Sequence, residues 1–481
     1  MPHAPLHIAV DDPVIVDGLA RIRDEQHVPG PHPIGVVAEA EGAAVRVLAG
    51  LDDSGRHDAR DIDFVTIDPP GSRDLDQALH IERRNGGAGG WRVRYAIADL
   101  AAFVGPGGAL DQSCWDRGLT YYLPDGGAPL HPEVLGVGAA SLLPKQDRPA
   151  VLWTIDLDAD GGVTSTSVVR AIVRSRDQLT YEQVQRDVDR GTAAETLVLL
   201  SEVGEVRRRQ EAARGGVSLD LPAQRVEADD GGYRIEFETT VPAMAWNAQI
   251  SLLAGMVAAE RMVTAGVGLL RTVPPPEGFV VDRVRHTARA LHVAWPDGAS
   301  YADVVRDLRS DVPDQAALLS LASRGLRGAG YIALPVDGDG VELAHAAVAA
   351  QYAHVTAPLR RLGDRYVAET CLAIEAGDRP PAWVTERLPA LPETLGRASS
   401  RESAAARAAV DLVEALVLRP MVGDTLDVTV VAADKEGSTV VCRDPAIQAR
   451  VHQRLELGDH VTVRITAADP TTRTVNLEPT G

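Results

Sequence analysis

The C-terminal end of the chain carries the pattern that limits the fold most. Residues 419–424 combine proline and glycine in a turn-rich hinge. Five short runs of β-forming residues follow it, at residues 425–431, 438–442, 449–451, 460–465 and 474–477. So many short strands in so small a segment predict a closed barrel of the OB type. The rest of the chain must therefore supply a core of its own.

The remainder of the 481-residue chain mixes strands and helices, which predicts an α+β fold with about two to four domains. We expect a small N-terminal α/β unit (1–60), a mixed sheet packed with helices (61–420) and the barrel (421–481). In the N-terminal unit, residues 13–27 suit a helix. The other expected elements are strands at residues 34–38, 44–49, 91–97, 150–157 and 164–173, and helices at residues 181–189, 193–214, 243–265, 301–321, 361–376 and 395–417.

The charge balance limits the partners. Sixty-eight acidic residues against 48 basic ones give a formal charge of −20, which argues against binding polyanions over the whole surface. A basic channel inside an acidic shell remains compatible with this balance. Only Lys145 and Lys435 are lysines. The many arginines therefore suggest a coding bias, and are not by themselves a nucleic-acid signal.

Cysteine usage and hydropathy favour the cytoplasm. The three cysteines, Cys114, Cys371 and Cys442, lie far apart and show no pairing pattern, which is typical of a reducing compartment. The longest apolar stretch, residues 243–270, is interrupted by polar and charged side chains, so we expect no membrane span. We also expect no signal peptide at the N-terminus.

The most informative segment for chemistry is a loop rich in carboxylates. A β-like run leads to Asp68, the residues Pro69-Pro70-Gly71 turn the chain sharply, and Asp74 and Asp76 follow two residues apart. Three converging carboxylates suit a hard cation such as Mg²⁺, which can activate water for phosphodiester cleavage. A solvated acidic loop is the alternative that the spacing alone leaves open.

The full string around this loop, and further segments in the same order, resemble the ribonuclease II (RNB) family. The first piece is Thr66-Ile67-Asp68, five residues, Asp74-Leu75-Asp76 and then Ala78. The pieces that follow are residues 95–99, 121–124, 130–132, 142–150, 179–184 and 352–364. Together they span about residues 61–420. The C-terminal barrel is similar to the S1-type domain that follows many RNB modules.

This resemblance implies a 3′→5′ exoribonuclease that acts on single-stranded RNA, uses Mg²⁺ (with Mn²⁺ as an alternative) and releases nucleoside 5′-monophosphates. It assigns catalysis to Asp74, Asp76 and Arg360. It assigns metal binding to Asp68, Asp74, Asp76 and Gln77. It assigns RNA contacts to Tyr122, Tyr181, Asn247, Thr356 and Arg360, with Tyr122 clamping a base and Tyr181 reading the sugar. We expect single-stranded RNA as partner, no membrane attachment and a monomer.

Among the positions that depart from the family pattern, three lack an expected acid. Gln77 stands where a fourth aspartate is usual, and Asn247 and Ala406 stand where carboxylates are common. These changes motivate a second hypothesis, a catalytically weakened RNA-binding relative. A third hypothesis is a metal hydrolase of another phosphate ester, such as short oligonucleotides.

Several residues have ordinary structural interpretations. We interpret His131 and His354 as structural, and Asp99 as the cap of a helix. Arg361 suits a surface position, because adjacent helix residues do not face the same way. Arg214 is expected on a solvated helix face, where it would serve as a control for Arg360. The barrel has no Phe, Trp or Tyr in residues 421–481, so a role in packing alone stays open for it.

Overall fold

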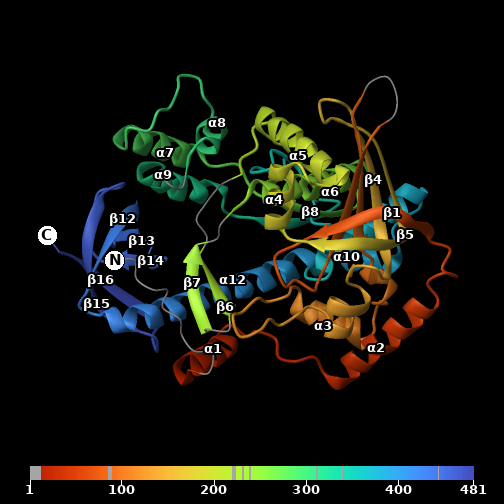
Figure 1. Ribbon diagram of the computed structural model, residues 1–481, viewed down its shortest axis with the longest axis horizontal. Helices are drawn as coiled ribbons and strands as arrows, with labels where there is room; N and C mark the ends of the chain where they lie inside the picture. The colour runs from red at the N-terminus through yellow and green to blue at the C-terminus, as the bar shows by residue number, and fades with distance from the viewer. Residues whose placement is uncertain are drawn as a thin grey trace.

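The computed structural model describes residues 12–84, 89–218, 224–229, 232–237, 240–309, 312–336, 340–442 and 444–480. Two five-stranded barrels lie at opposite ends of the molecule, with helices between them and over their faces (Figure 1). The long helix α12 (Leu391–Leu418) leads from the larger part of the chain to the C-terminal barrel. No helix within the described ranges is long and apolar enough to cross a membrane.

The first barrel closes the mixed sheet that the sequence predicts. Its strands follow the chain order, from β1 to β5, and a parallel pairing of β1 with β5 joins the two ends. Large buried side chains such as Phe64, Tyr95 and Trp153 fill the core around it. The strands are β1 (His57–Ile67), β2 (Gln77–Arg83), β3 (Trp91–Ala98), β4 (Asp147–Leu157) and β5 (Val163–Leu179).

Helices cover this barrel. Those over residues 181–190, 195–213, 242–265 and 362–376 lie where the helical periodicity predicts them, whereas those over residues 109–117 and 382–385 are not predicted. Helices α5 and α6 pack so closely that a side chain at Gly204 would meet the Cβ of Trp246 at 2.6 Å, which makes glycine necessary there. Helix α10 packs against both α6 and β5. The helices are α3 (Ala109–Arg117), α4 (Tyr181–Arg190), α5 (Glu195–Ala213), α6 (Pro242–Ala265), α10 (Leu362–Ala376) and α11 (Ala382–Thr385).

The expected helix over residues 301–321 is divided in two. Helix α8 (Tyr301–Arg306) ends before α9 (Pro313–Ser323), and Pro313 opens α9, where its fixed φ and missing N–H are tolerated. Helix α7 (Gly278–Ala290) packs with them beside the C-terminal barrel (Figure 1). Short strand pairs complete this part: β6 (Gln224–Asp229) with β7 (Gly232–Phe237), β8 (Gly268–Thr272) with β9 (Gly330–Leu334), and β10 (Ala344–His345) with β11 (Ala350–Gln351).

The N-terminal prediction of two strands is wrong. Residues 34–38 and 44–49 belong to one helix, α2 (Ile34–Ala49), which follows α1 (Pro13–Glu25). Its buried residues Val36, Ala40, Ala43 and Ala44 recur at helical spacing. The many alanines also favour a helix. Treating the segment as two short apolar runs hides this helical pattern.

The C-terminal barrel confirms the five predicted strands. They pair in the order β12-β13-β14-β16-β15 around a small apolar core. The strands are β12 (Thr425–Ala433), β13 (Ser438–Cys442), β14 (Ile447–Val451), β15 (His460–Asp469) and β16 (Thr474–Pro479). Glu414 of α12 ties this barrel to the body, because its Oε1 accepts hydrogen bonds from Gln224 Nε2 (2.7 Å) and Gln448 N (2.6 Å).

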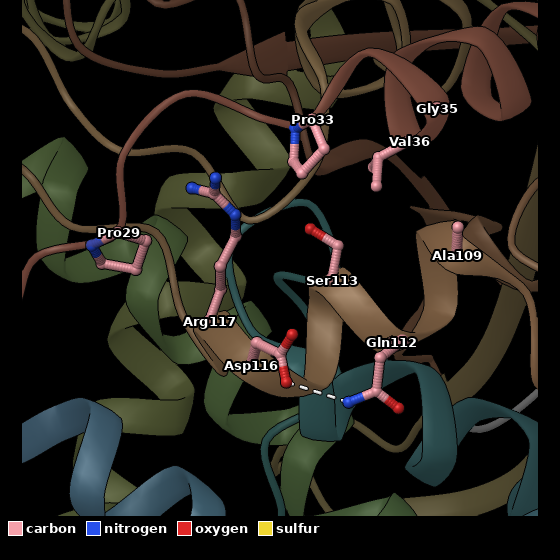
Figure 2. Close-up of a pocket in the computed structure, with 9 residues that line it drawn as sticks. All are labelled: Pro29, Pro33, Gly35, Val36, Ala109, Gln112, Ser113, Asp116 and Arg117. Atoms are coloured by element: carbon pink, nitrogen blue, oxygen red, sulfur yellow. Dashed lines mark hydrogen bonds between the residues drawn. The ribbon is translucent and has the colours of Figure 1, made fainter.

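A pocket of about 460 Å³ lies between the segment around Pro29–Val36 and helix α3 (Figure 2). The Arg117 guanidinium at its edge donates to the carbonyls of Gly30 and Pro129. Asp116 accepts a hydrogen bond from Gln112 at 2.9 Å. The chain itself therefore satisfies these polar groups, and no residue of the carboxylate loop lines the pocket.

Candidate active site

The carboxylate loop connects β1 to β2 at one rim of the first barrel. Asp68 directly follows β1, and its N–H donates to the Leu179 carbonyl at 3.0 Å. Asp76 directly precedes β2, and its carbonyl accepts from Ala98 N at 2.9 Å. Gly71 adopts a φ of +80° in the sharp turn that the sequence predicts. Asp68 and Asp76 thus stand on fixed strand ends, 9% and 3% exposed.

Burial perturbs both carboxyl groups. Desolvation raises the pKa of Asp68 to about 7, and the nearby charge of Asp74 adds to the shift. Desolvation also raises the pKa of Asp76 to about 7, although Arg360 and the Leu359 N–H pull it down. One oxygen of Asp68, Oδ2, is buried without a hydrogen-bond partner. Buried acids with an unpaired oxygen are typical of a site that receives a cation or a proton.

A turn that lies far from the carboxylate loop in sequence contacts Asp76. The backbone N–H of Leu359 donates to Asp76 Oδ1 at 2.7 Å, and Arg360 Nε lies 3.3 Å from Asp76 Oδ2. The Arg360 side chain is 42% exposed, so its guanidinium reaches both the carboxylate and solvent. Thr356 is buried in the same segment. The structure therefore brings Asp76 and Arg360 together, as the resemblance implies.

The neighbouring residues of this turn differ from expectation. Arg361 is mostly buried, with 16% of its side chain exposed, and pairs with Asp364 at 2.8 Å. Asp364 also accepts the Ala357 N–H at 2.7 Å, so one carboxylate of α10 holds both ends of the turn. The surface position predicted for Arg361 is wrong, because Arg361 turns inward to this acid. A carboxylate three residues after an arginine at a helix start is the signal that sequence reasoning missed.

Two tyrosines lie near the acids of the loop. The Tyr122 hydroxyl donates to Asp74 Oδ2 at 3.3 Å, and Tyr122 is 52% exposed. Tyr181 begins α4 behind the capping box formed by Thr180 and Gln183. Its hydroxyl accepts from Asn247 Nδ2 at 3.4 Å, and desolvation and the charge of Asp68 raise its pKa. One exposed aromatic ring and one hydrogen-bonded hydroxyl thus lie near the acids.

The three positions that lack an expected acid, Gln77, Asn247 and Ala406, lie on three different elements. Gln77 opens β2 directly after Asp76 and is half-buried. Asn247 is buried in α6 and faces Tyr181. Ala406 lies within α12 and is half-buried. A metal-binding role for Gln77 stays a prediction.

The acids suit a hard cation chemically. Carboxylate oxygens are the donors that Mg²⁺ prefers, and the buried Asp68 Oδ2 lacks a partner. Arg360 and Tyr122 contact the other two acids, Asp76 and Asp74. Across the described ranges, no three His, Cys, Asp or Glu side chains already stand in a metal-holding arrangement.

Other singled-out residues have partners within the fold. Asp99 is buried between Arg56 (2.7 Å) and Arg170 (2.5 Å) and caps no helix with its side chain, so its predicted capping role is wrong. Arg214 ends α5 half-buried, with Nε bonded to the Val348 carbonyl at 2.8 Å, so it is not on a solvated face. His354 pairs with the Tyr331 hydroxyl at 2.9 Å.

Comparison with known protein families accounts for most of the chain. The RNB domain family matches residues 56–374. The RNase II-type exonuclease C-terminal S1 domain matches residues 424–480. The first match contains the carboxylate loop, both tyrosines and the Arg360 turn. The second match coincides with the C-terminal barrel.

Curated relatives carry the name Ribonuclease R. The protein from Escherichia coli is 30% identical over 328 residues, covering 65% of this chain and 39% of the relative. The protein from Thermotoga maritima is 26% identical over 465 residues, covering 92% of this chain and 64% of the relative. The chain therefore spans between 39% and 64% of the length of these two relatives.

Solved structures share the fold. Mycoplasma genitalium RNase R in complex with ribose-methylated single-stranded RNA superposes with a TM-score of 0.86 at 18% identity, covering 97% of this chain and 78% of that one. A yeast pseudonuclease superposes with a TM-score of 0.70 at 16% identity, covering 96% of this chain and 58% of that one. At these identities the likeness shows the fold alone.

Proposed function

Because this chain belongs to the RNB domain family, we propose that it is an exoribonuclease that degrades single-stranded RNA from the 3′ end to nucleoside 5′-monophosphates with Mg²⁺. The observation that carries the proposal is the meeting of Asp76 with the Arg360 turn beside the unpaired oxygen of Asp68. Acids and an arginine at one place are what phosphodiester hydrolysis requires.

The acids and the arginine have complementary tasks. Asp68, Asp74, Asp76 and Gln77 offer the oxygens that would hold Mg²⁺ or Mn²⁺. When bound, the metal supplies an activated water and a counter-charge for the scissile phosphate. Asp76 orients Arg360 through the 3.3 Å contact to Nε, so the rest of the guanidinium points its N–H groups at incoming phosphate. Arg360 then stabilises the charge that develops on the phosphate in the transition state.

The two tyrosines would hold the RNA. Tyr122 offers an exposed ring on which a base can stack without sequence preference. Tyr181, fixed by Asn247, presents a hydroxyl near the acids, where a 2′-OH would distinguish RNA from DNA. Thr356 completes the RNA-binding set from within the Arg360 segment. The proposed setting is a cytoplasmic monomer, and the buried thiols of Cys114 and Cys371 fit a reducing compartment.

A catalytically weakened RNA-binding protein is the second candidate. Gln77, Asn247 and Ala406 replace acids that are common in the family, which would lower the negative charge available to a metal. The same fold also occurs in the yeast pseudonuclease, so the fold alone does not decide between the two.

The test is a time course on 5′-labelled single-stranded RNA with Mg²⁺, resolved on a denaturing gel. We expect products that shorten progressively from the 3′ end and mononucleotides that co-migrate with 5′-monophosphate standards. Chelation with EDTA and the variant Asp76→Asn should each abolish the products, while a native gel in Ca²⁺ should still show RNA binding by Asp76→Asn.

Other outcomes identify the alternatives. Intact RNA with a gel shift for both proteins would contradict the enzyme and support the RNA-binding relative. Cleavage of dinucleotides with intact long RNA would support a hydrolase of short oligonucleotides. Equal cleavage by wild type and Asp76→Asn would exclude this site as the source of the activity.

A further inference from the structure

The turn that carries Arg360 has a third anchor, in addition to Asp364 of α10 and Asp76. The N–H groups of Ala357 and Leu359 are bound by acids, as described above. Pro358 between them has no N–H, so its carbonyl is the one polar backbone group it can offer. That carbonyl lies 3.1 Å from Nε2 of His131, which is 3% exposed. A side chain 227 residues away thus bonds the residue directly before Leu359.

The neighbours of His131 determine which ring nitrogen carries the proton. A carbonyl can only accept, so Nε2 must donate its hydrogen to Pro358. Nδ1 lies 3.3 Å from Cys114 Sγ, so the thiol of α3 donates to the unprotonated nitrogen. Burial, together with the charges of Arg365, His32 and Arg117, lowers the pKa of His131 to about 3. The ring is therefore neutral at physiological pH and remains a donor to Pro358.

We propose that His131 is a positioning residue for Arg360. Its hydrogen bond fixes the Pro358 carbonyl, and the two residues that follow then present the Leu359 N–H and the Arg360 guanidinium to Asp76. The proposal rests on the exoribonuclease function proposed above, because it assigns His131 to the use of Arg360 in that reaction. His131 acts through the turn and touches neither the metal site nor the RNA.

The packing explains why the turn needs this bond. Ala357, Pro358 and Leu359 are buried, so water cannot replace a lost partner of the Pro358 carbonyl. The Arg360 carbonyl is bound by Thr120 N at 3.0 Å, which ties the far end of the turn to the segment that contains Tyr122. Without His131, the middle of the turn would shift between these fixed ends. A displacement of about 1 Å at a catalytic group can lower a rate by about 100-fold.

The primary experiment compares three variants of the full chain. His131→Leu removes the donor, whereas His131→Gln keeps an N–H donor at the position of Nε2. His32→Leu is the matched control, because His32 is a neighbouring histidine that bonds the Pro129 carbonyl (3.1 Å) and Ser113 Oγ (3.2 Å) and interacts with the backbone of His131, but does not touch the turn. We expect His131→Leu to lower single-turnover cleavage by about 10- to 100-fold and to weaken RNA binding less than Arg360→Ala does, because the guanidinium is displaced but not removed. His131→Gln should recover most of the rate, and His32→Leu should match wild type.

A double-mutant cycle separates positioning from general loss of stability. If His131 acts through Arg360, His131→Leu should have little further effect on the cleavage rate in an Arg360→Ala background. Multiplicative losses in the double variant would overturn the proposal. Equal rates for His131→Leu and His32→Leu would overturn it as well.

A second measurement does not depend on activity. Amide hydrogen exchange of the peptide that contains Ala357 and Leu359 reports the order of the turn directly. We expect faster exchange at these amides in His131→Leu, with protection restored in His131→Gln and unchanged in His32→Leu. If wild type binds RNA but does not cleave it, the proposed exoribonuclease function is wrong. The amide exchange rates then remain as the test of whether His131 positions the turn. Unchanged exchange in His131→Leu would then overturn it.

Discussion

The backbone N–H of Leu359 donates to Asp76 Oδ1 at 2.7 Å, although 283 residues separate the two in sequence. This bond joins the loop between β1 and β2 to the turn before α10. It also explains the proximity of the Arg360 guanidinium to the same carboxylate, since Arg360 is the next residue. The candidate active site is therefore assembled by tertiary contacts between segments that lie far apart in sequence.

The arginine of this turn should dominate phosphate binding. We expect Arg360→Ala to weaken binding of single-stranded RNA by roughly 10- to 100-fold, because a charged hydrogen bond is typically worth about 1.5–3 kcal/mol. Arg208→Ala is the control, since Arg208 is 52% exposed on α5 and pairs only locally with Glu205. Fluorescence anisotropy in Ca²⁺ measures both. Equal losses in the two variants would contradict a localised RNA site.

The exposed ring of Tyr122 should act by stacking. We expect Tyr122→Ala to weaken RNA binding by about 1–3 kcal/mol, the usual range for one stacked base. Tyr122→Phe keeps the ring and loses only the 3.3 Å bond to Asp74, so it should bind RNA like wild type. Titrations with a short oligonucleotide distinguish the two effects. Similar defects in both variants would show that the hydroxyl, and not the ring, matters.

The hydroxyl of Tyr181 should distinguish RNA from DNA. Removing it in Tyr181→Phe leaves Asn247 Nδ2 without this partner and removes a group that could read a 2′-OH. We expect the preference for RNA over matched DNA to fall by about 10-fold. Parallel cleavage assays on the two oligonucleotides measure the ratio. An unchanged ratio would assign sugar recognition to another residue.

The bond between α12 and the C-terminal barrel should depend on pH. Burial, with Asp411 nearby, raises the pKa of Glu414 to about 7, even though Gln224 and Gln448 lower it. The folded state thus holds this proton more tightly than the unfolded state does. The contribution of Glu414 to the free energy of unfolding is therefore full below about pH 4.5, falls as pH rises to about 7, and is then constant.

Glu414→Gln removes this titration. We expect the variant to match wild type in urea unfolding near pH 5 and to be more stable by about 1–3 kcal/mol near pH 8. The same difference at both pH values would show that packing, and not ionisation, accounts for the change.

The sequence predicts those elements whose signal is local. Local patterns within short windows predict the run that leads to Asp68 in β1, strands β3, β4 and β5, the five strands of the C-terminal barrel, and helices α4, α5, α6, α10 and α12. They do not predict strand β2 or helices α3 and α11. Helix α2 was misread because its glutamates and glycine separate two apolar runs that a helix brings onto one face. The prediction of one helix over residues 301–321 misses the break between α8 and α9, because the apolar periodicity continues across the segment that ends at Pro313.

The contacts that bring distant segments together in the site cannot be predicted from short sequence windows. Nothing in the spacing of residues predicts that β1 pairs in parallel with β5, or that Pro358 meets His131. The acids and Arg360 were identified through motifs that resemble a family, and not through periodicity. Arg214 shows the limit of local reasoning, because its Nε bonds the Val348 carbonyl, 134 residues along the chain.

The parallel pairing that closes the first barrel has a consequence for how substitutions can alter turnover and selectivity. The Asp68 N–H bonds the carbonyl of Leu179, and Tyr181 follows two residues later, so one seam carries both a proposed metal-binding acid and the proposed reader of the sugar. Substitutions that loosen this seam would impair turnover and selectivity together. A variant that accepts DNA at full speed must therefore be sought at Tyr181 or Asn247 themselves, and not in the strands that deliver them.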